Sequence, residues 1–99
     1  MQIVMVEFAV GEDRVDACVE ALKDITGNFV ALQPQFHGAI LHVEKATGTV
    51  INRMIWDSHE DFIHFRDSNA EKIGEVLGEF GPKGRMLDVV AEIGPSHGG

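Results

Sequence analysis

The spacing of the apolar residues changes along this chain, and the order of these changes limits the folds that it can adopt. Residues 2–10 (QIVMVEFAV) are almost continuously apolar and rich in β-branched types, which predicts a strand. From residue 12 to residue 29 the apolar residues recur every three or four positions, which is typical of an amphipathic helix. Glu12 and Asp13 fall in its first turn, where the helix dipole favours negative charge, and Pro34 stops the helix.

A hairpin is predicted next. Residues 36–46 and 49–57 are rich in β-branched and other apolar types, and each predicts a strand. Thr47 and Gly48 lie between them and supply a turn. The two segments are therefore expected to pair with each other as antiparallel neighbours.

A second helical region starts with a capping motif. Ser58 is the expected N-cap and Asp61 the third helical residue, which fits a capping box. Residues 67–69 (Asp-Ser-Asn) interrupt this helix, and a further helix is expected over about 69–80. Residues 85–93 (RMLDVVAEI) alternate well enough to predict a fourth strand.

The resulting order of elements is β-α-β-β-α-β, with the second helical region in two parts. This is the order of the ferredoxin-like α+β fold, an antiparallel four-stranded sheet with helices on one face. Because the predicted strands are apolar on both sides, we expect the open face to meet a partner, and a homodimer that presses two sheets together would satisfy it. We predict one domain over residues 1–94 and a flexible tail over 95–99.

Length, charge and cysteine content exclude several classes of protein. A chain of 99 residues has room for one domain. Its formal net charge of −8 and its scattered basic residues argue against binding to nucleic acid or to an anionic membrane surface. The single cysteine, Cys18, rules out an intramolecular disulfide and is expected to pack in the core. With no apolar run of about 18 residues and no signal-peptide pattern at the N-terminus, we expect a cytoplasmic protein.

The five histidines do not have the spacing of a metal site. No two of them are four residues apart, and the HExxH motif is absent, so we predict no metal. His42 is of more interest because it lies between apolar residues within a predicted strand. It is either a surface or hydrogen-bonded histidine, or a base in a pocket that is poised near neutral pH. His59 is expected to be exposed.

The third predicted strand carries the main candidate site. Alternation places four residues on one face of it: Val50, Asn52, Met54 and Trp56. A buried amide must find a hydrogen-bond partner, from the backbone or from a ligand, and a face of Asn, Met and Trp suits a flat, weakly polar molecule. The alternative is a core tryptophan beside a satisfied asparagine. On the next helix, Phe65 and His64 are further candidates, although His64 also fits a solvated pair with Glu60.

The stretch from Phe29 to Asp67 resembles the antibiotic biosynthesis monooxygenase family of dimeric α+β barrels. Two motifs carry the resemblance. The first leads into the second predicted strand and consists of Pro34, Phe36 and Gly38. The second is a Trp-x-Ser-x-Glu-x-Phe spacing at the end of the hairpin, formed by Trp56, Asp57, Ser58, Glu60 and Phe62. The order of elements over the whole chain agrees with that family. The resemblance implies a homodimer in which each subunit has a pocket between its sheet and its helices.

Some members of this family oxidise polycyclic aromatic phenols or quinols with dioxygen and without metal or flavin. The resemblance therefore implies a monooxygenase without cofactor that acts on an aromatic or polyketide-like phenol or quinol. Its catalytic candidates are His42, Asn52 and Trp56, and its substrate-binding candidates are Met54, Phe65 and His64. The alternative is a non-catalytic dimer of the same fold that binds a small aromatic molecule, or an accessory dimer of the cyclase type.

The chain departs from the haem-degrading relatives within this resemblance. Those proteins carry an Asn on the first strand, a second Trp on the following helix and an axial His further along. Here the first strand has no Asn, Phe65 stands at the place of the second Trp, and residues 74–76 contain no His. Haem breakdown is therefore not expected. A His that often begins the helix after the break is also missing, since Asn69 and Ala70 occupy that stretch.

Overall fold

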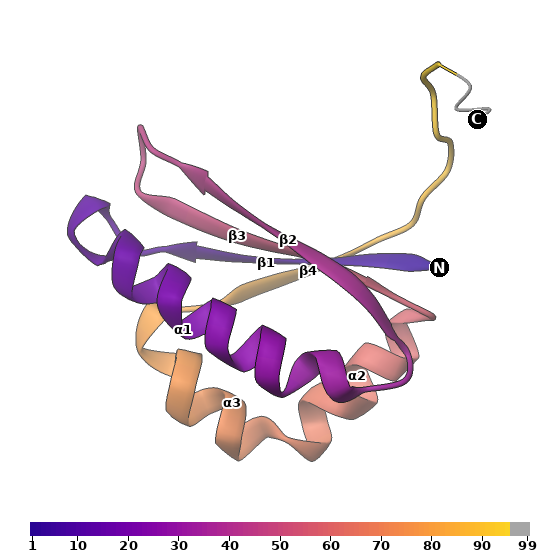
Figure 1. Cartoon of the computed structure of the whole chain (residues 1–99), viewed down its shortest axis with the longest axis horizontal. Helices are drawn as coiled ribbons and strands as arrows, with labels where there is room; N and C mark the ends of the chain where they lie inside the picture. Colours follow the sequence, from indigo (N-terminus) through magenta and orange to yellow (C-terminus); the bar gives the residue numbers. More distant parts are fainter. Residues whose placement is uncertain (96–99) are drawn as a thin grey trace.

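A computed structural model describes residues 1–95 of the chain and shows one antiparallel sheet with helices on one of its faces (Figure 1). The strands are β1 (Gln2–Ala9), β2 (Phe36–Glu44), β3 (Thr49–Trp56) and β4 (Lys83–Leu87), in the spatial order β2-β3-β1-β4. The helices are α1 (Val15–Asn28), α2 (His59–Ser68) and α3 (Ala70–Leu77). Short 3-10 turns complete the order: η1 (Glu12–Arg14), η2 (Val30–Leu32) and η3 (Gly78–Phe80). The predicted ferredoxin-like α+β fold is thereby confirmed.

The strand β3 shows the predicted alternation. Its even-numbered residues are buried towards the helices: Val50, Asn52, Met54 and Trp56. The odd-numbered residues Ile51, Arg53 and Ile55 point to the open face and are partly exposed. Because β3 lies between β2 and β1, the backbone on both of its sides is used in pairing, and its side chains form the floor under the helices.

The helix α1 supplies much of the core. It buries Cys18, Leu22 and Ile25 against Phe8 of β1 and Val50 of β3, as its apolar spacing predicts. A fully buried side chain of the size of Leu or Phe contributes about 1.5–3 kcal/mol relative to an exposed one. These contacts hold one half of the helical layer on the sheet. The other half is held by a second cluster around Trp56.

The fourth strand is shorter than predicted. Residues 85–93 were expected to be extended, but β4 ends at Leu87, which pairs with Ile3 at the beginning of β1. Beyond this pair β1 has almost no residues left to bond with, so the alternating residues that follow have no neighbouring strand. The chain runs away from the sheet (Figure 1), with Val90 94% and Ile93 97% exposed. Of the tail predicted over 95–99, residues 96–99 lie outside the described part.

The capping motif at the start of α2 is confirmed. The hydroxyl oxygen of Ser58 accepts a hydrogen bond from the backbone N–H of Asp61 at 3.1 Å, and the same hydroxyl donates to the Asp61 carboxylate at 2.9 Å. The predicted interruption is also present, because α2 ends at Ser68 and α3 begins at Ala70. Asn69 lies between them, and its side-chain amide donates to the carbonyl of Phe65 at 2.8 Å.

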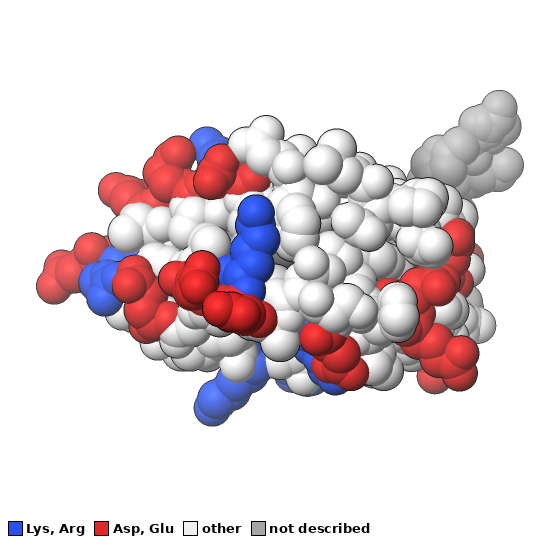
Figure 2. Space-filling view, turned by 90° about the horizontal axis from the view of Figure 1, so that it is seen from below, with Lys and Arg blue, Asp and Glu red and all other residues white. Residues whose placement is uncertain are grey.

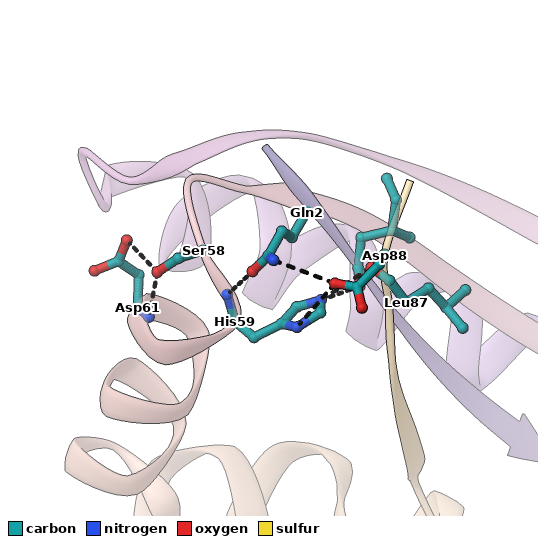
Figure 3. A network of polar contacts seen from close by, with 7 residues as sticks. Gln2, Ser58, His59, Asp61, Leu87 and Asp88 are labelled. Carbon is teal, nitrogen blue, oxygen red and sulfur yellow. Dashed lines mark hydrogen bonds and ion pairs between the residues drawn. The ribbon is translucent and has the colours of Figure 1, made fainter. Parts of the chain in front are cut away.

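The prediction that His59 is exposed is wrong. Its side chain is 20% exposed, and Nε2 lies 3.1 Å from the carbonyl oxygen of Ile3 and 3.0 Å from that of Leu87 (Figure 3). Both neighbours are acceptors, so Nε2 carries a proton and donates. The backbone N–H of His59 donates to Gln2 Oε1 at 2.6 Å, and Gln2 Nε2 donates to Asp88 Oδ1 at 3.2 Å. His59 therefore ties the start of α2 to the adjacent ends of β1 and β4.

Charged side chains are spread over the helix side of the molecule. In Figure 2 acidic groups lie at both ends and in the middle of the face in view, and the basic groups are fewer and scattered. The excess of acidic groups on this face agrees with the net charge of −8. Within residues 1–95, no helix is long and apolar enough to cross a membrane.

Candidate functional site

A cavity of about 330 Å³ lies between the helix side of the sheet and the helices. Its apolar walls come from every layer of the fold: Val6, Leu22, Met54, Phe62, Phe65 and Met86. Sites for small molecules in proteins usually enclose 300–1,000 Å³ and are mainly apolar with a few polar groups. The size and lining of this cavity therefore suit a small, largely apolar ligand.

Asn52 provides the polar group on the sheet side of this cavity. It is 4% exposed, and its Nδ2 lies 3.4 Å from the hydroxyl oxygen of Thr26 on α1. Its Oδ1 is buried and has no hydrogen-bond partner within residues 1–95. A buried acceptor left without a partner costs about 1–3 kcal/mol. A ligand that donates a hydrogen bond to Oδ1 would recover this cost.

The position of Asn52 in the sheet explains why its amide is left unpaired. Asn52 stands opposite Val6 on β1 and Leu41 on β2, so both of its neighbours are apolar. The backbone of all three strands is engaged in the sheet, and the helices above contribute only Thr26 as a polar contact. Asn52 is therefore a polar side chain surrounded by apolar residues on the sheet side of the cavity.

Two of the predicted substrate-binding residues lie in the cavity wall. Met54 is on β3, two residues after Asn52 and on the same face. Phe65 is on the buried side of α2. The structure thus brings Asn52, Met54 and Phe65 together around one space.

Trp56 lies behind this wall and is not among the lining residues. It is fully buried, and its ring centroid is 5.6 Å from that of Phe36, 5.6 Å from that of Phe62 and 5.4 Å from that of Phe65. Its Nε1 has no hydrogen-bond partner within the described residues. Through Phe62 and Phe65, Trp56 supports two residues that do touch the cavity.

His42 lies on the other face of the sheet. It pairs with Ile51, whereas its neighbour Leu41 pairs with Asn52, and cross-strand partners share a face. His42 is also exposed. The prediction that His42 shares a pocket with Asn52 and Trp56 is therefore wrong for this chain, because the hairpin register puts it out of phase by one residue.

His64 is exposed on α2 and is not among the residues that line the cavity. The helix turns its Phe62 and Phe65 inward, and the side chain of His64 points in a different direction from the helix axis.

Within residues 1–95, no group of three or more His, Cys, Asp or Glu side chains could hold a metal ion. Among residues 1–95, those that line the cavity include no imidazole and no carboxylate.

Sequence reasoning missed two polar side chains of the cavity lining, Thr26 and Arg66. Thr26 stands four residues after Leu22 on the same face of α1, and Arg66 stands four residues after Phe62 on α2. The sequence contained a signal for both residues, because a polar residue four positions after a buried apolar residue lies on the same face of the helix. Arg66 is the one charged residue among those lining the cavity.

Cys18 belongs to the packed core and not to the cavity. It is fully buried between α1 and the sheet, as its place on the apolar stripe of the helix predicts. Burial raises the pKa of its thiol above the ordinary value of 9.0, and the positive charge of Arg14 opposes this only in part. Cys18 is therefore a neutral thiol at physiological pH.

Comparisons with known proteins gave matches among solved structures alone, since no family model and no curated protein matches the chain. A monooxygenase from the gene ActVA-Orf6 of Streptomyces coelicolor, in complex with Nanaomycin D, has a TM-score of 0.80 and 22% identity over 96% of this chain and 92% of its own. A putative antibiotic biosynthesis monooxygenase from Deinococcus radiodurans has a TM-score of 0.75 and 10% identity, over 97% and 99%. A putative monooxygenase from Shewanella loihica has 29% identity and a TM-score of 0.63, over 93% and 99%. The resemblance to antibiotic biosynthesis monooxygenases is thus confirmed for the fold.

Proposed function

We propose that this chain is a monooxygenase of the antibiotic biosynthesis type, which oxidises an aromatic or polyketide-like phenol or quinol with dioxygen and without a cofactor. The observation that carries the proposal is the buried, unpaired Oδ1 of Asn52 in the lining of an apolar cavity. A phenolic hydroxyl is a donor on a flat apolar body, which is what such a site favours. The fold shared with proteins named monooxygenases supports the choice of reaction.

In this proposal the protein binds and orients the substrate, and the substrate supplies the electrons. The phenolic hydroxyl donates to Asn52 Oδ1 while the ring packs against Met54 and Phe65. Loss of a different proton to water, from the second hydroxyl of a quinol or from the ring carbon of an anthrone, gives an electron-rich anion that can reduce dioxygen. For an anthrone, the ring carbon loses two hydrogens and gains one oxygen atom, and the second oxygen atom leaves with both hydrogens as water. The products are one quinone and one water molecule.

Trp56 is proposed to act as a positioning residue. It contacts Phe62 and Phe65 from behind and so fixes the wall against which the substrate ring would lie. His42 lies across the sheet from the cavity, so we expect it to take no part in proton transfer within the same subunit. Its substitution is therefore a suitable control.

Oxygen consumption with a panel of quinols and anthrones, with and without chelator, tests the proposed reaction. We expect turnover of at least one of these compounds that is insensitive to chelator, lost in Asn52→Leu and unchanged in His42→Ala. Absence of turnover for every phenol tested would contradict the proposal. Turnover that is abolished by chelator would contradict the part of it that excludes a cofactor.

We also propose that the chain forms a homodimer through the open face of its sheet. This face carries apolar side chains from all four strands: Ile3, Met5, Ile40, Ile51, Ile55 and Leu87. Ile40 on the edge strand β2 is 53% exposed and Leu87 at the end of the other edge strand β4 is 39% exposed, so apolar surface on this face is open to a partner. Light scattering should give twice the mass of the chain, and Ile40→Glu should shift it towards the monomer. A monomeric native chain would contradict this proposal.

The absence of an acid or base from the cavity lining favours one alternative, a dimer that binds the same aromatic molecule without turning it over. Native mass spectrometry of protein purified from its source distinguishes the two. A retained aromatic metabolite, together with no oxygen consumption on that same compound, would support binding alone. Oxidation of the retained compound would support the monooxygenase.

A further inference from the structure

The lining of the cavity includes a cationic residue, Arg66 on α2. Asn52 lines the cavity from the sheet and Arg66 lines it from the helical layer, so the two groups belong to opposite layers of the fold. The guanidinium carbon of Arg66 lies 5.9 Å from the ring centroid of Phe62, which is part of the wall. A cation in this place is notable in a chain with a net charge of −8.

The internal contacts of Arg66 leave most of its hydrogen-bond donors free. Its Nε donates to Asp67 Oδ1 at 3.1 Å, and the two side chains are 48% and 65% exposed. An exposed pair of this kind is weak, because water competes for both charges. Within residues 1–95 the terminal nitrogens Nη1 and Nη2 make no hydrogen bond. These two nitrogens form a planar edge that can bind a carboxylate through two parallel hydrogen bonds.

We propose that the cavity selects an aromatic ligand with a hydroxyl donor at one end and an anionic group, such as a carboxylate, at the other. The donor binds Asn52 Oδ1, the apolar body fills the cavity, and the anionic group pairs with Arg66 at its edge. This inference rests on the proposed function, because it uses the same cavity and the same orientation of the phenol. It adds that Arg66 determines specificity for acidic over neutral aromatic substrates.

Arg14 offers a matched control for Arg66. Its guanidinium carbon lies 5.0 Å from the ring centroid of Phe80, and its Nη2 donates to Glu79 at 2.9 Å. Its side chain is 50% exposed, close to the value for Arg66. Both residues therefore lie over an aromatic ring and pair with one carboxylate, but only Arg66 lines the cavity. Any effect of lost charge in general appears equally in both variants.

The test uses the full chain and two probes, a hydroxynaphthoic acid with its hydroxyl and carboxylate at opposite ends of the rings, and the methyl ester of that acid. Calorimetric titration gives the ratio of their dissociation constants. We expect the native protein to bind the acid about tenfold more tightly than the ester, because only the acid can form a charge-assisted hydrogen bond with the Arg66 guanidinium. Arg66→Gln should reduce this ratio to about one, Arg66→Lys should leave an intermediate ratio, and Arg14→Gln should keep it at about ten.

The outcomes separate this inference from the proposed function. Equal binding of acid and ester by the native chain, or a tenfold ratio that persists in Arg66→Gln, would overturn the role of Arg66 and leave the phenol site standing. Binding of neither probe by the native chain would overturn both. If Arg66→Gln does not fold, as judged by circular dichroism, the ratio in Arg66→Lys decides, and a ratio equal to the native one contradicts the inference.

Discussion

Two polar side chains of this chain, the buried Asn52 amide and the partly buried His59 imidazole, have opposite hydrogen-bond environments. His59 meets two backbone carbonyls at 3.0 and 3.1 Å, and its own backbone N–H meets Gln2 (Figure 3). Asn52 keeps one weak contact at 3.4 Å, and its Oδ1 meets none within the described residues. The histidine is surrounded by partners, whereas the asparagine lines a cavity.

The difference shows how a structural polar residue can be told from a functional one. A polar group that serves the fold has its hydrogen bonds completed by the protein, because an unpaired buried group lowers stability. A polar group that serves a ligand must keep a bond free until the ligand arrives, and the chain bears that cost in the meantime. On this criterion His59 stabilises the fold, and Asn52 is the residue that we propose to bind a ligand.

The largest effect is expected at Asn52. Replacement by Leu removes the acceptor and keeps the branched shape of the side chain. The hydroxyl of a bound phenol would then be buried without a partner at a cost of about 1–3 kcal/mol, so turnover or affinity for a phenol should fall about 10- to 100-fold. The free energy of unfolding should stay the same or rise, since an unpaired amide is replaced by an apolar group. Steady-state oxygen uptake and urea unfolding measure the two quantities. A variant that loses stability and keeps turnover would reverse the assignment.

His59 should give the opposite pair of results. His59→Ala removes one N–H that two backbone carbonyls share and leaves both carbonyls without this donor. An acceptor that loses its partner costs about 1–3 kcal/mol, so the free energy of unfolding should fall by about 2 kcal/mol. Phenol binding should be unchanged at temperatures where the variant is folded, because His59 does not line the cavity. Thermal unfolding should show a midpoint about 10 °C lower.

His64→Ala is the control for His59→Ala. His64 lies five residues further along α2 and is exposed, so its loss should leave the free energy of unfolding within about 0.5 kcal/mol of that of the native chain. Equal destabilisation by the two substitutions would mean that the hydrogen bonds of His59 contribute nothing beyond helix propensity.

Sequence patterns were sufficient for properties that depend on neighbouring residues. The order of the elements followed from local periodicity, the cap at Ser58 from its own four residues, and the faces of β3 from alternation. The shared face of Asn52 and Met54 was predictable for the same reason.

Properties that depend on the meeting of distant segments were not predictable. The face of His42 is set by the register of the hairpin, and a shift of this register by one residue would put His42 on the opposite face. The bonds of His59 join residues 28 and 56 positions apart, which no local pattern records. The length of β4 depends on where β1 begins.

A smaller effect is expected from Ser58, which begins the same helix as His59. Ser58→Ala leaves the backbone N–H of Asp61 without its 3.1 Å bond, and loss of an N-cap costs about 1 kcal/mol. The free energy of unfolding in urea should fall by that amount, with the phenol affinity unchanged. Ser58→Asp, which restores a capping acceptor at the positive end of the helix, should recover most of the loss. No recovery would indicate that the hydroxyl acts in another way.

The smallest effect concerns Cys18, a buried group that lies neither against a cavity nor in a polar network. Burial raises the pKa of its thiol in the folded chain, so above about pH 9.0 the unfolded chain releases this proton first. The unfolded state then binds fewer protons than the folded state, and the free energy of unfolding falls as the pH rises, whereas below this range the contribution is constant. The chain contains no tyrosine, so few other groups titrate there. Urea unfolding between pH 8 and pH 10 should show the decline in the native chain and a flatter profile in Cys18→Ala, because that variant has no thiol to protonate. Equal slopes in the two proteins would mean that the thiol reaches water in the folded state. The region around Cys18 would then not be tightly packed, and it would not differ from the region around Asn52, which lines a cavity.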